Sequence, residues 1–160
     1  MTNQQQHEAT AYWTVGPDRG ELRSEALRVP GPEEALVRSL YSGISKGTEL
    51  VVHHAAVPPC IAEEMRAPHQ EGSFPSPVKF GYLSVGVVEQ GPADWVGQTV
   101  FCLHPHQDRY VVPVSSLTRV PDGVPPRRAV RACVVGTERV VLAEAEERAA
   151  SADEASSERA

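Results

Sequence analysis

The sequence predicts a small, mainly β protein whose short strands close into a barrel. Two observations predict it: short apolar segments recur along most of the chain, and turns rich in glycine and proline separate them. Helical character is brief, because Pro58-Pro59 interrupts the one region that has it. A content of 41% hydrophobic and 22% charged residues is that of an ordinary folded chain.

The first half is expected to hold three strands and two helical turns. Residues 12–15 and 22–29 are two strands, and the glycines and proline of 16–20 predict the hairpin turn between them. Residues 35–41 form a third short apolar run. After Gly43 the character changes, and residues 48–52 and 61–66 each permit a helical turn.

Three more strands are expected over 82–89, 99–103 and 110–114, and Gly86 inside the first of them indicates a bulge or a close backbone approach. From about Thr137 the chain is nearly all Ala, Glu, Arg, Ser and Asp, compatible with a helix over 140–148 but unable to bury a face over 151–160. The expected organisation is a flexible N-terminus (1–10), one domain (11–131) and a polar tail (132–160).

Composition disfavours several classes of protein. A net charge of -6 makes nucleic acid an unexpected partner, since phosphate binding needs clustered Lys and Arg. No apolar run has the length of a membrane span and the start lacks signal-peptide features, which predicts a cytoplasmic protein. The three cysteines are far apart and form no Cys-x-x-Cys pair, so neither a disulfide framework nor a structural zinc site is expected.

Several strings together resemble the medium-chain dehydrogenases/reductases. Residues 41–49, YSGISKGTE, are similar to the family's strand-to-helix turn, and 77–88 and 96–101 are similar to its Gly-His-Glu-x-x-Gly-x-Val and Gly-Asp-Arg-Val elements. They occur in the family's order, and 110–113 and 120–124 continue it. The resemblance covers roughly residues 12–130. It implies a GroES-like, partly open β-barrel with short helices, as the catalytic domain of an alcohol dehydrogenase-like enzyme.

The departures from the family point to its zinc-free branch. Catalytic zinc takes about three thiolate, imidazole or carboxylate ligands. Ser45 stands at the cysteine position and Tyr82-Leu83 replaces the His-Glu pair, so we expect no metal site. The resemblance implies NAD or NADP as the cofactor of a full-length enzyme and a small carbonyl compound or alcohol as its substrate.

Without zinc, hydride transfer still needs a group that stabilises or protonates the developing oxyanion. The resemblance places Ser45, Lys46, Thr48 and Tyr82 around the cleft that faces the nicotinamide, and they are the candidate catalytic residues. Thr48 is also a candidate cofactor contact. For Thr48, capping of the next helical turn is an equal alternative, and for Tyr82 core packing is a strong one.

Two further segments carry candidate binding residues. Two histidines flank Pro105 and invite a metal interpretation, but a surface loop is favoured, with His106 touching substrate and Gln107 touching cofactor. By the resemblance, Arg66 lies in a substrate-side loop where it would clamp an anionic group, although solvent exposure is the default expectation.

The family's cofactor-binding Rossmann domain, with its Gly-x-Gly-x-x-Gly turn, has no counterpart here, and Gly136 is the last glycine. We therefore expect a chain truncated before that domain. A frameshift or premature stop near the codon of Val130 is our hypothesis, and a natural short protein is the alternative. Translating the downstream gene sequence in all three forward frames decides between these two hypotheses. A frameshift or premature stop requires a frame that encodes a strand, a glycine turn and a helix.

The expected function is that of a catalytic-domain fragment of a zinc-independent, NAD(P)-dependent oxidoreductase. The alternative is a stand-alone GroES-like binding or interaction module without catalysis. We expect no useful turnover from this chain alone, and NAD(P)(H) turnover by a purified sample would refute that. A surface normally covered by the cofactor domain would favour self-association.

Overall fold

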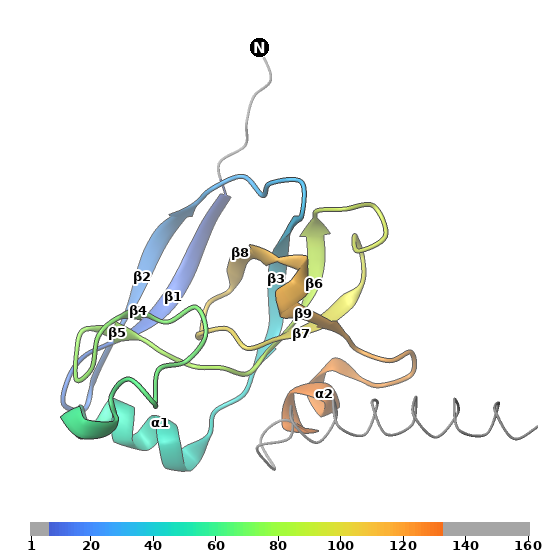
Figure 1. The fold of residues 1–160 in the computed structure, drawn as a ribbon. Helices are drawn as coiled ribbons and strands as arrows, with labels where there is room; N and C mark the ends of the chain where they lie inside the picture. The colour runs from blue at the N-terminus through green and yellow to red at the C-terminus, as the bar shows by residue number, and fades with distance from the viewer. Residues whose placement is uncertain (1–6, 133–160) are drawn as a thin grey trace, which may run out of the picture.

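The computed structural model describes residues 7–132 and shows two antiparallel β-sheets with short helices at their margins (Figure 1). The first sheet has the strand order β2-β1-β5-β4, and the second has the order β8-β3-β6-β7-β9. The second sheet curls into half a barrel, so the mainly β, partly open GroES-like barrel expected from the sequence is confirmed.

The elements follow one another closely along the chain. The strands are β1 (His7–Gly16), β2 (Arg19–Leu27), β3 (Glu34–Ser42), β4 (Glu71–Gly72), β5 (Val78–Lys79), β6 (Ser84–Gln90), β7 (Thr99–Cys102), β8 (Arg109–Pro113) and β9 (Leu117–Arg119). The helices are α1 (Lys46–His53) and α2 (Pro126–Ala132), with 3₁₀ turns η1 (Pro59–Ile61) and η2 (Val114–Ser116).

The predicted hairpin is confirmed, but its first strand begins earlier than expected. His7–Thr10 belong to β1, so these residues correct the prediction of a flexible segment over 1–10. The reason is that Ala9 is buried and pairs with Glu25 on β2. Residues 1–6, and the polar tail from 133 onward with its expected helix over 140–148, lie outside the described residues.

Other differences concern elements too short to produce a periodic pattern. The strands β4 and β5 have two residues each, and β9 has three. The sequence did not predict η1, which ends at Ile61, but the single helical turn expected over 61–66 follows it, since the Met65 amide donates to the Ile61 carbonyl (2.9 Å). The expected close approach at Gly86 is confirmed, since a Cβ there would lie 2.4 Å from the carbonyl oxygen of Arg38.

The core consists of three apolar clusters. The largest covers the inner face of the second sheet, and its buried members are Ala35, Val37, Val88, Val100, Cys102, Tyr110, Val112 and Leu117. A second forms beneath α1 from Val52, Val57, Ala67, Val78 and Phe80. In the third, α2 contributes Val130 against Leu83 and Val85. The second cluster is the most relevant to function, because two of its members, Val52 and Phe80, line the cavity described below.

Residues 104–108, which we call the joining segment, connect the two sheets. The Tyr12 amide of β1 donates to the His106 carbonyl (2.9 Å), and the Asp108 amide donates to the Thr10 carbonyl (3.0 Å). Toward the second sheet, the Ser39 amide of β3 donates to the Asp108 carbonyl (2.8 Å). The segment therefore satisfies backbone groups of both sheets and fixes their relative position.

Lys79 is a buried cation held by two carboxylates. Its side chain is 1% exposed, and its Nζ lies 2.6 Å from both Glu25 and Glu71. The third hydrogen bond goes to Gln107 Oε1 of the joining segment (3.0 Å). Trp13 donates its indole N–H to Glu25 (2.8 Å). A buried ammonium needs such partners, so the cluster ties β1, β2, β4 and β5 to the joining segment.

His104 is buried as a stacked ring at the start of the joining segment. Its ring lies 3.8 Å from that of Tyr110 and 5.4 Å from that of His69, measured between centroids. Its Nδ1 is 3.1 Å from the Pro105 carbonyl oxygen. Burial lowers the pKa of His104 to about 3, so the imidazole is neutral at physiological pH.

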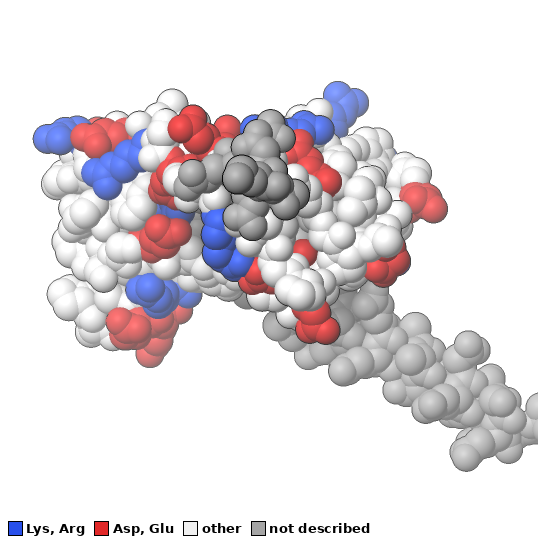
Figure 2. Space-filling view, turned by 90° about the horizontal axis from the view of Figure 1, so that it is seen from above, with Lys and Arg blue, Asp and Glu red and all other residues white. Residues whose placement is uncertain are grey.

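The surface carries charges of both signs. Figure 2 shows basic and acidic side chains interspersed among large uncharged areas on the face seen there. Several of them pair, for example Arg38 and Arg109 with Glu89. Over residues 7–132, no helix combines the length and the apolar character required to cross a lipid bilayer.

We expect the Lys79 cluster to be more sensitive to loss of its carboxylates than to loss of its cation. The double variant Glu25→Gln/Glu71→Gln leaves a buried ammonium without a counter-charge and should lose roughly 3–5 kcal/mol of unfolding free energy. Lys79→Met should lose less than half of that, because the Glu25 and Glu71 side chains are 22% and 58% exposed and can be solvated. Urea unfolding followed by far-UV circular dichroism measures both, and a larger loss in Lys79→Met would contradict this account.

We expect His104 to make the fold acid-sensitive at mild pH. The pKa of the folded-state imidazole is about 3 and that of the unfolded one is 6.5, so the unfolded state binds more protons between these values. Stability is therefore full above pH 6.5 and falls as pH drops toward 3, by about 2 kcal/mol between pH 7 and pH 5. His104→Phe, which keeps the ring stack, should flatten this slope in urea unfolding, and an unchanged slope would contradict the assignment.

Candidate functional site

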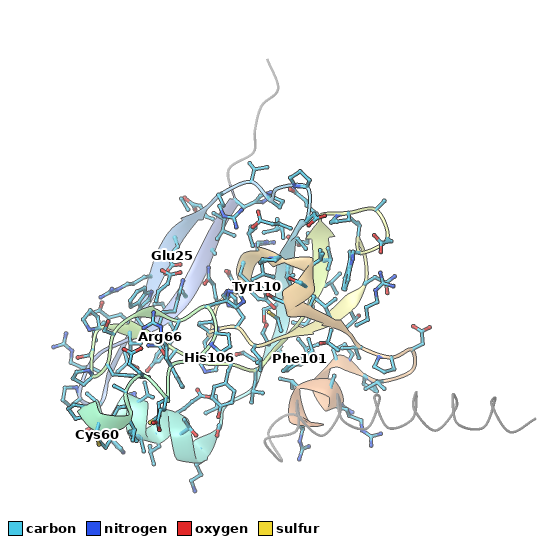
Figure 3. The ribbon with its side chains drawn as sticks, viewed as in Figure 1. Glu25, Cys60, Arg66, Phe101, His106 and Tyr110 are labelled. Atoms are coloured by element: carbon cyan, nitrogen blue, oxygen red, sulfur yellow. The ribbon has the colours of Figure 1, made fainter. Side chains whose placement is uncertain are left out.

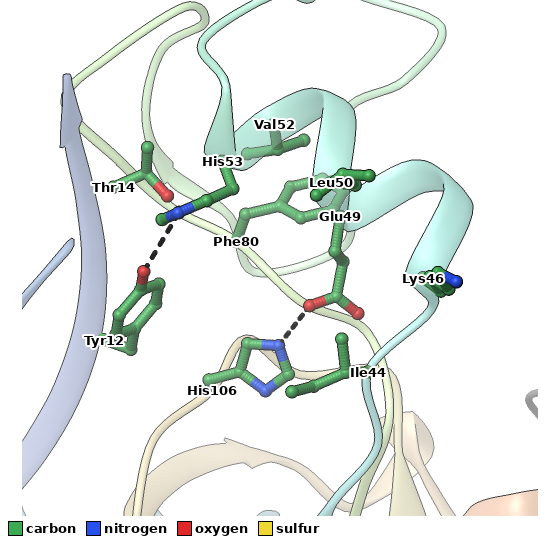
Figure 4. Close-up of a pocket in the computed structure, with 10 residues that line it drawn as sticks. All are labelled: Tyr12, Thr14, Ile44, Lys46, Glu49, Leu50, Val52, His53, Phe80 and His106. Atoms are coloured by element: carbon green, nitrogen blue, oxygen red, sulfur yellow. Dashed lines mark hydrogen bonds and ion pairs between the residues drawn. The ribbon is translucent and has the colours of Figure 1, made fainter. Parts of the chain in front are cut away.

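A cavity of about 440 Å³ lies between β1, α1 and the joining segment (Figure 4). Its lining residues are Tyr12, Thr14, Ile44, Lys46, Glu49, Leu50, Val52, His53, Phe80 and His106. The four apolar members form most of the wall, and the polar members come from three separate elements. A mostly apolar cavity with a few converging polar groups is the usual form of a small-molecule site.

The first turn of α1 brings Glu49 into the cavity. Ser45 occupies the N-cap position without a side-chain cap bond, and the Glu49 carboxylate instead accepts the Ser45 amide (2.8 Å). This satisfies a backbone donor at the helix start, where a negative charge is also stabilised by the helix dipole. The helix therefore holds Glu49 in one position, and its second oxygen remains for another partner.

That partner is His106. Its Nε2 lies 2.5 Å from Glu49 Oε2, and the two side chains are only 17% and 11% exposed. Its Nδ1 hydrogen-bonds with the hydroxyl of Ser42, at the exposed end of β3. Ser42 Oγ also lies 3.2 Å from the Leu83 carbonyl oxygen. A continuous chain of hydrogen bonds thus runs from the surface at Ser42 through the imidazole to the carboxylate in the cavity.

Gly81 makes room for this histidine. It has φ of +130°, a conformation that side chains disfavour, and a Cβ there would lie 3.0 Å from both the amide nitrogen and the ring of His106. The His106 amide itself donates to the Phe80 carbonyl (3.3 Å). The position of the imidazole therefore depends on a glycine at this point of the chain.

A second polar pair belongs to the same cavity. The hydroxyl of Tyr12 lies 3.3 Å from Nδ1 of His53, near the C-terminal end of α1. His54, the next residue, is turned outward and pairs with Asp18 of the β1–β2 turn. The helix is thus tied to the first sheet on two sides, while Tyr12 and His53 face the cavity.

The structure brings together only some of the residues proposed from the sequence. Lys46 and His106 line the cavity, and their catalytic and substrate-binding roles stay predictions. Ser45, Thr48 and Tyr82 are not among its lining residues. Tyr82 packs edge-on against Phe80 (5.9 Å between centroids), in agreement with the core-packing alternative. A catalytic role for these three stays a prediction.

Arg66 and Gln107 lie away from the cavity lining. Arg66, labelled in Figure 3, lies on the loop before β4. Its guanidinium donates to the carbonyls of Gln70 (3.3 Å) and Gly72 (3.5 Å). Gln107 is buried and its side-chain oxygen accepts from Lys79. Both side chains thus have structural partners, and their predicted ligand contacts remain untested.

Sequence reasoning missed four residues of this site: Tyr12, Ser42, His53 and, as a ligand-facing group, Glu49. The spacing of Glu49 and His53, four residues apart on a helix, is the one local signal that places two of them on a common face. Their partners come from segments 41 to 64 residues away, and no local pattern encodes such contacts.

Comparison with solved structures assigns the fold. Human synaptic vesicle membrane protein VAT-1 homolog-like protein matches with a TM-score of 0.57 and 17% identity, over 78% of this chain and 39% of that one. CAD from Helicobacter pylori, solved with NADP(H), matches with a TM-score of 0.59 and 11% identity, over 78% and 45%. Pseudomonas syringae quinone oxidoreductase matches with a TM-score of 0.53 and 24% identity, over 76% and 36%. No protein-family model and no curated protein sequence matches the chain.

The chain has the GroES-like fold of the medium-chain dehydrogenases/reductases. This agrees with the resemblance carried by the motifs of residues 41–49, 77–88 and 96–101. The chain spans about two fifths of the length of these solved proteins.

Within residues 7–132, no three His, Cys, Asp or Glu side chains gather in a group able to hold a metal ion. The resemblance aligns Ser45 and Tyr82-Leu83 with the family's ligand positions, and these residues carry neither thiolate nor imidazole, so zinc independence stays a prediction. Residues 7–132 also contain no glycine-rich strand–turn–helix unit of the kind that binds a pyrophosphate.

We expect Gly81→Ala to displace His106 and destabilise the GroES-like domain by roughly 1–3 kcal/mol, because it combines an unfavourable φ with a close contact. The measurements are urea unfolding and the nuclear magnetic resonance signal of the His106 ring. Gly47→Ala is the matched control, since a Cβ there meets no atom within 4 Å and alanine favours α1. An unshifted His106 signal in Gly81→Ala would contradict the proposed dependence.

Proposed function

We propose that this chain supplies the substrate-binding and proton-donating half of a zinc-independent, NAD(P)-dependent alcohol dehydrogenase-like oxidoreductase. The observation that supports it most is the His106–Glu49 pair in the wall of a largely apolar cavity. Similar folds occur in a CAD solved with NADP(H) and in a quinone oxidoreductase. The substrate would be a small carbonyl compound or the corresponding alcohol.

The cavity supplies binding and desolvation. Ile44, Leu50, Val52 and Phe80 present apolar surface to the carbon skeleton of a substrate. Exclusion of water strengthens each hydrogen bond made to the carbonyl oxygen. Lys46 is exposed at the cavity, so its ammonium would add positive potential where negative charge develops.

The hydrogen-bond chain supplies the proton. When bound, a nicotinamide supplies the hydride that adds to the carbonyl carbon. When the substrate binds, the Nε2–H of His106 leaves Glu49 and gives its proton to the carbonyl oxygen. The Ser42 hydroxyl turns from the Leu83 carbonyl to give its proton to Nδ1, and exposed Ser42 is then reprotonated by water. Glu49 accepts from Nε2–H in the resting state and so selects the tautomer that donates into the cavity.

A binding or interaction module without catalysis is the second candidate. Tyr41, Ile44 and Leu50 are 45%, 69% and 46% exposed, although all three are large and apolar. Such side chains mark contact surfaces, and a cofactor domain or another protein would cover them equally well. Cofactor affinity on adding a separately supplied Rossmann domain favours the oxidoreductase, whereas a stable complex with another protein and no nucleotide binding favours the module.

We expect the chain to bind acetophenone roughly fivefold more tightly than ethylbenzene, because only the ketone accepts a hydrogen bond from His106. Titration calorimetry with the whole chain measures both affinities. His106→Phe should remove the difference while retaining apolar binding, and His54→Leu, outside the cavity, should retain it. Equal affinities in the unmodified chain, or no binding of either compound, would contradict the proposed function.

A further inference from the structure

The proton relay leaves one polar pair of the cavity unused. Tyr12 and His53 are both half-buried, and their 3.3 Å separation is longer than that of a strong hydrogen bond. A tyrosine hydroxyl offers one donor and two acceptor positions, so this contact does not exhaust its capacity. Within an apolar wall, such a pair is a ready partner for a polar group of a ligand.

The two polar pairs have a defined spacing. Glu49 and His53 are four residues apart on α1, which places them on one face and about 6 Å apart along the helix axis. Their partners start from neighbouring points, because the Tyr12 amide donates to the His106 carbonyl (2.9 Å). Figure 4 shows Tyr12 and His53 toward one side of the cavity and Glu49 and His106 toward the other.

Apolar side chains occupy the space around and between these pairs. Phe80 is buried beneath α1, and Leu50 and Val52 come from the helix itself. A ligand that uses both pairs must therefore carry two hydrogen-bonding groups about 6 Å apart on an apolar body, matching one helical turn. A six-membered ring with its two polar substituents in para positions has this span and is flat enough to lie against Phe80.

We propose that the cavity selects ring-sized carbonyl compounds with a second hydrogen-bonding group para to the carbonyl. His106 contacts the carbonyl oxygen, and Tyr12 with His53 holds the second group. This inference rests on the proposed function, because it assumes that His106 marks the carbonyl end. It assigns Tyr12 and His53 as specificity-determining residues and leaves the proton relay unchanged.

The test compares three ketones by titration calorimetry on the whole chain: acetophenone, para-hydroxyacetophenone and ortho-hydroxyacetophenone. The para isomer should bind roughly fivefold more tightly than acetophenone, the gain of one hydrogen bond. The ortho isomer, with adjacent oxygens, should show no such gain. Tyr12→Phe and His53→Leu should each remove the para advantage, and the outward-facing His54→Leu should keep it.

The outcomes separate this inference from the function on which it rests. One outcome is that acetophenone binds more tightly than ethylbenzene in a His106-dependent manner while the para and ortho isomers bind equally. That result refutes the proposed contact of Tyr12 and His53 with a second polar group and leaves the proposed function standing. A para advantage that survives in both Tyr12→Phe and His53→Leu also refutes this contact. If no ketone binds, both the proposed function and the proposed contact of Tyr12 and His53 with a ligand are refuted.

Discussion

The joining segment is the constraint on which the rest of the structure depends. Its backbone bonds to Tyr12 and Thr10 in the first sheet and to Ser39 in the second, and Asp108 adds a side-chain bond to the Thr10 amide (2.7 Å). Buried backbone groups without partners are costly, so the segment cannot shift without losing several of these bonds together. The two sheets consequently form one unit, although each alone has exposed edges.

The same segment serves two sites through two neighbouring side chains, His106 and Gln107. His106 enters the cavity beside Glu49, whereas Gln107 turns to the buried ammonium of Lys79. Glu49 and Ser42 thus hold the imidazole at its two nitrogens, and the salt-bridged cluster holds the neighbouring Gln107. Placing the reactive group on a rigid junction, and its partner on the first turn of α1, keeps the site organised before a ligand arrives.

Local sequence patterns predicted most of the fold and little of the site. The alternating strands, the Gly/Pro turns and the close approach at Gly86 depend on neighbours in the chain, and these predictions are confirmed. The sequence did not predict the two-residue strands β4 and β5 or the helix α2, because these elements are defined by tertiary contacts. The pairing of His106 with Ser42 and Glu49 spans 57 to 64 residues, so His106 was recognised as a contact residue but not as the centre of a relay. Ser45, Thr48 and Tyr82 were chosen by resemblance, and the structure places them outside the cavity lining.

Native-state amide hydrogen exchange tests most directly whether the joining segment holds the sheets together and thereby positions the site. The account predicts that the amides of Tyr12, Ser39 and Asp108 exchange as one cooperative unit, with opening free energies close to that of global unfolding. Core amides of β3 and β6, on either side of their shared ladder, provide the reference. If the three amides instead exchange independently and much faster than this reference, the segment is a peripheral loop and the account is contradicted.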